Sequence, residues 1–76
     1  MPRLPRLTGL KVVKVFEAFG WQQVRQSGSH LILVHGEHTA TLSVPHHREV
    51  ALGTLRSLIR AANLTVEEFT RAADQI

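Results

Sequence analysis

The sequence predicts an α+β fold in which helices cover one face of a three-stranded antiparallel sheet. Two segments carry apolar residues at helical spacing, and the three strand-like segments between them are separated by turns short enough to imply antiparallel neighbours. A capping sequence near the end of the chain adds a short third helix. Because 76 residues is the length of one domain, we expect residues 1–76 to form a single domain, with residues 1–7 as a flexible basic N-terminus.

The first helix is predicted from one apolar face and two end signals. Its apolar residues recur at the i, i+3, i+4, i+7 spacing of a buried face: Val12, Val15, Phe16 and Phe19. Thr8 is placed to cap the start of this helix and Gly20 to end it. Lys11 and Lys14 fall on the other side, so the helix could present two ammonium groups outward.

Three strands are predicted next, over residues 21–26, 30–35 and 39–44. The third strand alternates, which places one set of residues on the buried face: Ala40, Leu42 and Val44. The second strand offers two apolar faces. One face holds His30, Ile32 and Val34, and the other holds Leu31, Leu33 and His35. Periodicity alone therefore leaves the buried face of the second strand open.

The remaining residues predict two further helices. The first of them has an apolar face at the same helical spacing and ends near Asn63: Leu55, Leu58, Ile59 and Ala62. Thr65 and Glu68 then fit a capping box, with Leu64 and Phe69 at the staple positions. The short C-terminal helix should bury Val66, Phe69 and Ala73.

Composition excludes several classes of protein. The apolar fraction of 43% is typical of a folded globular chain, and the longest apolar run is far too short to span a bilayer. With no secretion signal in residues 1–6, we expect a cytoplasmic protein without membrane contact. There is no cysteine to reinforce so small a core, which makes association with a partner an expectation.

Charge is distributed unevenly. Residues 1–35 hold five basic residues against one acidic residue, and the rest of the chain holds four against five. Basic groups in the first half could bind the phosphates of a nucleic acid, and the release of counterions would then supply the affinity. A basic surface that contacts only solvent explains the same pattern.

The chain has five histidines, a residue type that often binds metal ions. His35 and His38 superficially resemble a ligand pair, but they bracket a glycine turn and no cysteine or carboxylate cluster completes a coordination shell. We therefore interpret this pair as surface histidines and expect no metal or other cofactor. A serine hydrolase triad is not supported either, because Asp74 is the only aspartate, and the scattered glycines form no phosphate loop.

His30 is a candidate for proton transfer, because it lies at the start of the second strand after a turn over residues 25–29. RNA carries its own nucleophile in the 2′-hydroxyl, so cleavage needs only groups that move protons and offset charge on the phosphate. Histidine side chains titrate near neutral pH, and arginine grips phosphate oxygens. His30, Arg25 and Lys14 could supply these functions without a metal.

Five fragments in order then carry a family resemblance over residues 8–70. They are Gly20-Trp21, Arg25-Gln26-x-Gly28-Ser29-His30, Val44-Pro45-x-His47, Gly53-Thr54-Leu55-Arg56, and Asn63-Leu64-Thr65-x-Glu67-Glu68-Phe69. At these intervals the chain resembles the HicA family of bacterial toxins.

The resemblance implies a fold similar to the double-stranded RNA-binding domain, cofactor-independent cleavage of mRNA, and neutralisation by a HicB-type antitoxin protein. It also implies that His30 is the catalytic residue. The candidate RNA-binding residues are Lys11, Lys14, Arg25, Ser29 and His47. Family members often carry an aromatic residue shortly after the catalytic histidine, where this chain has Leu31, Ile32 and Leu33. No general acid is assigned, so roles of His46 and His47 in proton transfer stay open.

Two alternatives to a ribonuclease remain from the sequence. A non-catalytic RNA-binding module would use the basic surface and the shape of the fold alone. A domain that acts only through a protein partner would need no RNA affinity of its own.

Overall fold

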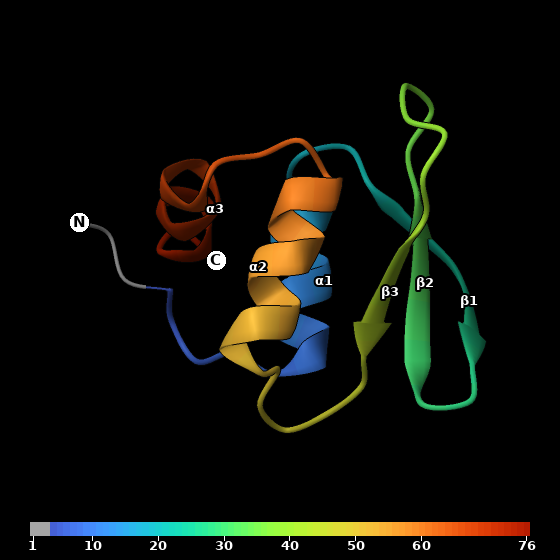
Figure 1. Cartoon of the computed structure of the whole chain (residues 1–76), viewed down its shortest axis with the longest axis horizontal. Helices are drawn as coiled ribbons and strands as arrows, with labels where there is room; N and C mark the ends of the chain where they lie inside the picture. Colours follow the sequence, from blue (N-terminus) through green and yellow to red (C-terminus); the bar gives the residue numbers. More distant parts are fainter. Residues whose placement is uncertain (1–3) are drawn as a thin grey trace.

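The computed structural model describes residues 4–76 and confirms the predicted α+β fold (Figure 1). The elements follow the predicted order: α1 (Gly9–Glu17), β1 (Gln22–Ser27), β2 (His30–Val34), β3 (Leu42–Pro45), α2 (Leu52–Ala61) and α3 (Val66–Ala73). The three helices lie on one side of the sheet, whose strand order is β1-β2-β3 with both pairs antiparallel. None of the helices within residues 4–76 has the length and apolar character needed to cross a membrane.

The ends of α1 form as the sequence predicts. The Thr8 side chain accepts a hydrogen bond from the Lys11 backbone N–H over 3.1 Å, which satisfies one free donor of the first turn. After the helix, Gly20 adopts a φ of +95°, and a Cβ there would lie 2.7 Å from Nε2 of His35. The backbone conformation therefore favours glycine at this position, and any larger residue would also require the His35 ring to move.

Strand pairing settles which face of β2 is buried. Leu31 lies opposite Val44 and Leu33 opposite Leu42, and all four side chains are buried against the helices. His30 and Ile32 alternate with them and so lie on the outer face of the sheet.

The strand boundaries differ from the prediction in two places. β3 begins only at Leu42, so Ala40 precedes the strand and is exposed, whereas we expected it on the buried face. In β1 every residue is exposed and the register shifts between Gln23 and Arg25, which marks a bulge. Trp21 lies just before β1. Its side chain is part of the core, with 2% of its surface exposed.

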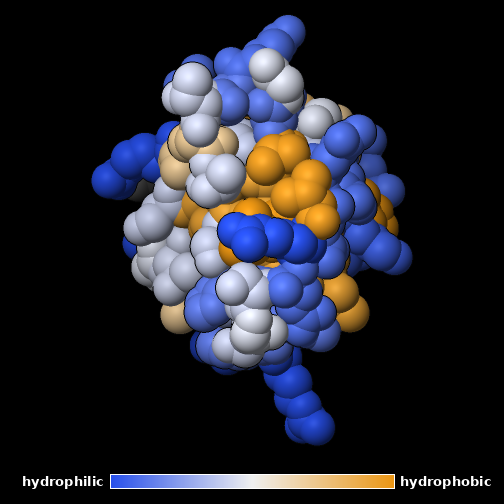
Figure 2. Space-filling model, turned by 90° about the vertical axis from the view of Figure 1, so that its right-hand side faces the viewer, coloured by the Kyte–Doolittle hydropathy of each residue, from blue (hydrophilic) through white to orange (hydrophobic). Residues whose placement is uncertain are grey.

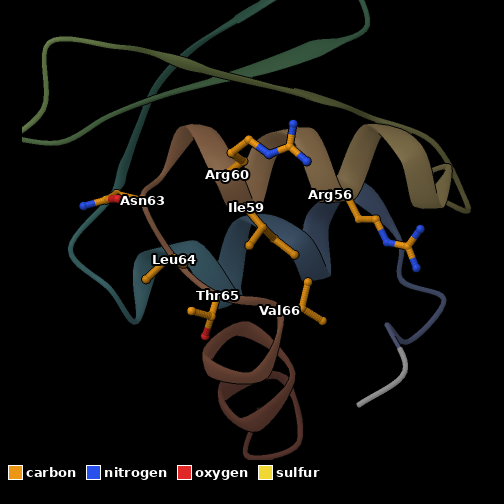
Figure 3. A pocket seen from close by; sticks show the side chains of 7 residues that line it. All are labelled: Arg56, Ile59, Arg60, Asn63, Leu64, Thr65 and Val66. Carbon is orange, nitrogen blue, oxygen red and sulfur yellow. The ribbon is translucent and has the colours of Figure 1, made fainter. Parts of the chain in front are cut away.

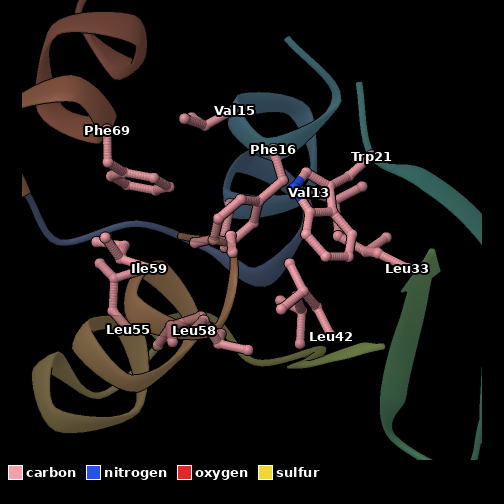
Figure 4. Packing of buried hydrophobic residues seen from close by; sticks show 14 of the residues in the cluster. Val13, Val15, Phe16, Trp21, Leu33, Leu42, Leu55, Leu58, Ile59 and Phe69 are labelled. Carbon is pink, nitrogen blue, oxygen red and sulfur yellow. The ribbon is translucent and has the colours of Figure 1, made fainter. Parts of the chain in front are cut away.

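The core is centred on Phe16 of α1 (Figure 4). Its ring lies 5.2 Å from that of Phe69 and 6.5 Å from that of Trp21, so one side chain joins α3 to the start of the sheet. The capping box predicted for α3 is present, because Thr65 and Glu68 exchange hydrogen bonds.

The described part of the N-terminal segment contacts the rest of the fold. Leu4 and Leu7 pack against the core, and the Leu7 carbonyl accepts a hydrogen bond from the Val50 N–H over 2.8 Å. We expected residues 1–7 to form a flexible N-terminus. The contacts of Leu4 and Leu7 concern the second part of this segment, and residues 1–3 lie outside the described residues.

Candidate functional site

His30 opens β2 on the outer face of the sheet, opposite Ser27 of β1 and Pro45 of β3. Its side chain is exposed, and no hydrogen bond from the described residues 4–76 holds the imidazole. Gly28, in the turn before it, adopts a φ of +59° with open space around its Cβ position, so the turn needs glycine for its backbone alone. The geometry leaves both ring nitrogens of His30 available to a ligand.

Three segments far apart in the sequence meet at the end of the fold that holds His30. The start of α1, the β1–β2 turn and the β3–α2 connection all lie at the lower edge of Figure 1. The His46 N–H donates to the Ser29 carbonyl over 2.7 Å, and the Gly9 N–H donates to the His47 carbonyl over 2.9 Å. These two hydrogen bonds fix the segment after β3 between the turn and α1.

Gly9 makes this junction possible. A Cβ at Gly9 would lie 2.2 Å from the carbonyl oxygen of Pro45, closer than any real contact, so only glycine lets α1 start against the end of β3.

The predicted site residues divide into two groups. Ser29 and His47 lie in the segments joined near His30, and Arg25 lies opposite Ile32, on the same outer face as His30 and diagonal to it. Lys11 and Lys14 lie on α1, in the layer on the other side of the sheet.

The lysines of α1 have surroundings of their own. The Lys11 ammonium donates to the backbone carbonyl of Ile76, and Lys14 lines a surface hollow of about 360 Å³ with Leu10 and Gln23. The structure therefore does not bring either lysine to His30.

A second hollow lies between the start of α1 and the β3–α2 connection. It has a volume of about 250 Å³ and is lined by Thr8, Leu10, His46, His47 and Arg48. His46 and Arg48 were not among the candidate binding residues predicted from the sequence. The signal that could have found them is the run of three basic or imidazole side chains directly after the strand that pairs with β2.

The outer face of the sheet is apolar at its centre. Figure 2 shows hydrophobic surface gathered in the middle of the side next to β1, with hydrophilic side chains around it. Val24 is 55% exposed, and Ile32 and Val34 of β2 are half-buried. The surface beside His30 can therefore contact apolar as well as anionic groups.

His35 and His38 form a different cluster, at the other end of the sheet. Their rings lie 4.7 Å apart and pack on Trp21 at 5.3 Å and 4.9 Å, so both histidines are half-buried at the surface and form part of the aromatic packing. His35 Nδ1 accepts from the Glu37 N–H over 3.0 Å; the proton therefore sits on Nε2 and donates to the Phe19 carbonyl at 3.0 Å. Among the described residues, no group of three or more His, Cys, Asp or Glu could hold a metal ion.

A third cavity lies between α2 and α3, away from all five histidines (Figure 3). Ile59 and Val66 form its apolar wall, while the guanidinium groups of Arg56 and Arg60 extend from α2. None of its lining residues offers an imidazole or a carboxylate, so it has no group suited to move a proton.

The chain matches the model of a known protein family. The family model described as HicA toxin of bacterial toxin-antitoxin matches residues 9–64, a span that runs from α1 through α2 and includes His30. None of the curated proteins matches the chain.

Proposed function

The chain belongs to the HicA family of toxins from bacterial toxin–antitoxin systems, and from this premise we propose that it is an endoribonuclease that cleaves mRNA in the cytoplasm with His30 as the catalytic residue. The observation that carries the proposal is the exposed imidazole of His30, which has no hydrogen-bond partner among residues 4–76 and shares its face of the sheet with Arg25. A general acid or base must reach the proton it moves, and this side chain is open to a bound strand.

The proposed reaction uses the 2′-hydroxyl of RNA as the nucleophile. His30 accepts the 2′-hydroxyl proton while the 2′-oxygen bonds to phosphorus, and the bond from phosphorus to the 5′-oxygen breaks. The products are a 2′,3′-cyclic phosphate and a 5′-hydroxyl, whose proton comes from an acid or from water. Arg25, on the same face and diagonal to His30, offsets charge on the phosphate oxygens. We propose that no metal takes part, so chelation with EDTA should leave the rate unchanged.

The experiment that tests the proposal compares His30→Ala with Gln22→Ala, an exposed residue of the same sheet. His30→Ala should abolish RNA fragmentation and growth inhibition while urea unfolding stays within about 0.5 kcal/mol of the native chain, because surface substitutions rarely cost more. Gln22→Ala should keep full activity. A fully active His30→Ala variant would refute the proposal, and salt-sensitive RNA binding without products at any pH would point to the non-catalytic module.

As a toxin of a toxin–antitoxin pair, the chain has an antitoxin partner, and we propose a HicB-type protein that covers His30 and the outer face of the sheet. The support is the apolar centre of that face beside a basic end, which an acidic partner with an apolar contact could cover. Ile32→Asp should weaken the complex, whereas Thr54→Asp on the exposed side of α2 should not. A complex that inhibits cleavage yet leaves the outer face accessible to hydrogen exchange would contradict occlusion.

A further inference from the structure

We propose that the hollow lined by Thr8, Leu10, His46, His47 and Arg48 is a phosphate subsite, which binds the RNA backbone phosphate next to the one cleaved at His30. The inference rests on the proposed function for the identity of the strand, and it adds a binding site that lies outside the reacting group.

Most of the surface of the hollow is apolar, but four of its five lining residues carry hydrogen-bond donors and none of the five is a carboxylate. Arg48 contributes a guanidinium with several N–H groups in a planar fork, and each imidazole contributes at least one N–H. The Thr8 hydroxyl already accepts a hydrogen bond from the Lys11 N–H, so its own proton remains free to donate. Such a set suits an anion with several acceptor oxygens, and a guanidinium would repel a metal ion.

The subsite lies within one nucleotide of His30. Pro45 is the strand neighbour of His30, and adjacent strands lie about 5 Å apart. His47 follows Pro45 by two residues, so its Cα lies no more than about 7 Å further along the chain. Consecutive phosphates of a single strand could therefore occupy His30 and the hollow together.

The backbone around the hollow is held in place before any ligand arrives. Hydrogen bonds from His46 to Ser29 and from Gly9 to His47 anchor both sides of the connection, and the Val50 N–H donates to the Leu7 carbonyl behind it. Because the backbone is already fixed, binding has to order only the exposed side chains of His46, His47 and Arg48, which lowers its entropic cost. Leu10, a lining residue that is 53% exposed, adds an apolar surface for a ribose or a base.

The test measures RNA affinity in the His30→Ala chain, so that no cleavage occurs. The probe is a short RNA with 2′-O-methyl groups, which lacks the nucleophile. Arg48→Ala should weaken binding about 5- to 10-fold, and it should lower the slope of log K against log salt by about 0.7, the value of one phosphate contact on a single strand. Arg60→Ala is the matched control, because this exposed arginine of α2 lines the cavity between α2 and α3 instead, and it should change neither quantity.

Other outcomes separate this inference from the proposed function. Unchanged affinity and slope for both Arg48→Ala and His47→Ala would overturn the subsite, even if His30→Ala abolishes cleavage. Loss of antitoxin binding without loss of RNA affinity would overturn it as well, because the hollow would then serve a protein contact. If His30 proves dispensable for cleavage while Arg48→Ala weakens RNA binding as expected, the proposed catalytic role fails and the phosphate site stands.

Discussion

The backbone N–H of His46 donates to the carbonyl oxygen of Ser29 over 2.7 Å, so the residue after β3 is fixed against the residue that precedes His30. This bond continues the β2–β3 ladder by one step past the last paired residues, His30 and Pro45. It places the β3–α2 connection, with its histidines and Arg48, at the same end of the molecule as His30. The position of α1 against that connection then decides whether this end of the fold is rigid.

Gly9→Ala should therefore destabilise the fold. Its Cβ would lie 2.2 Å from the Pro45 carbonyl oxygen, and no side-chain rotation relieves this contact, because the backbone fixes the position of both atoms. We expect a loss of about 2–4 kcal/mol in the free energy of unfolding, the scale of strain from overpacking or from a broken backbone contact. Urea unfolding followed by circular dichroism measures it.

Gly53→Ala is the control for Gly9→Ala. Gly53 lies in the first turn of α2, is exposed, and has nothing within 4 Å of its Cβ position. Alanine is the better helix former, so this change should stabilise the chain by up to about 1 kcal/mol. Equal effects of the two substitutions would show that the contact between α1 and β3 is not tight.

Gly20 and His35 should be energetically coupled. Gly20→Ala introduces strain at a φ of +95° and places a Cβ 2.7 Å from His35 Nε2, so it should cost about 2–3 kcal/mol. In the His35→Ala chain the steric part of that cost disappears. A double-mutant cycle by urea unfolding should give a coupling of at least about 0.5 kcal/mol.

Gly36→Ala controls for the loss of a glycine near the same turn. Nothing lies within 4 Å of its Cβ position, so a change within about 0.5 kcal/mol is expected. Additive effects of the Gly20 and His35 substitutions would exclude the proposed contact between them.

How far the sequence predicts this fold depends on whether local pattern or strand pairing decides each feature. Helical spacing and capping residues are local, and they were sufficient for α1 and for the capping box at Thr65. The buried face of β2 is not local: His30, Ile32 and Val34 are as plausible a core set as Leu31 and Leu33, until pairing with Val44 and Leu42 selects between them.

The candidate site shows the same division. The position of His30 at the start of a strand was predictable, because the glycine turn precedes it in the sequence. The run His46-His47-Arg48 is visible in the sequence, but the hollow that it lines was not predictable, since the hollow needs α1 to pack on the β3–α2 connection. For the same reason, amphipathic spacing placed Lys11 and Lys14 outside the core but could not show that they lie in the opposite layer from His30.

Thr70→Val should stabilise the protein. The Thr70 hydroxyl is buried and has no hydrogen-bond partner among residues 4–76, and valine replaces it with a methyl group of similar size. Removing an unsatisfied buried hydroxyl should raise the free energy of unfolding by about 1 kcal/mol. Thr54→Val, at an exposed position of α2, should change it by less than about 0.5 kcal/mol. A destabilised Thr70→Val chain would mean that the hydroxyl is satisfied in solution.

The layer arrangement predicts unequal roles for Arg25 and Lys14 in RNA cleavage. Arg25 lies on the outer face, diagonal to His30, while Lys14 lies on α1 behind the sheet. A hydrogen bond to a charged group contributes about 1.5–3 kcal/mol, so Arg25→Ala should lower kcat/KM about 10- to 100-fold.

Lys14→Ala removes only a distant charge, which salt largely screens, so the loss should stay below about threefold near 0.15 M salt. Single-turnover cleavage of one RNA by both variants measures the difference. Equal losses would mean that the bound strand continues along α1, past the hollow at its start and as far as Lys14.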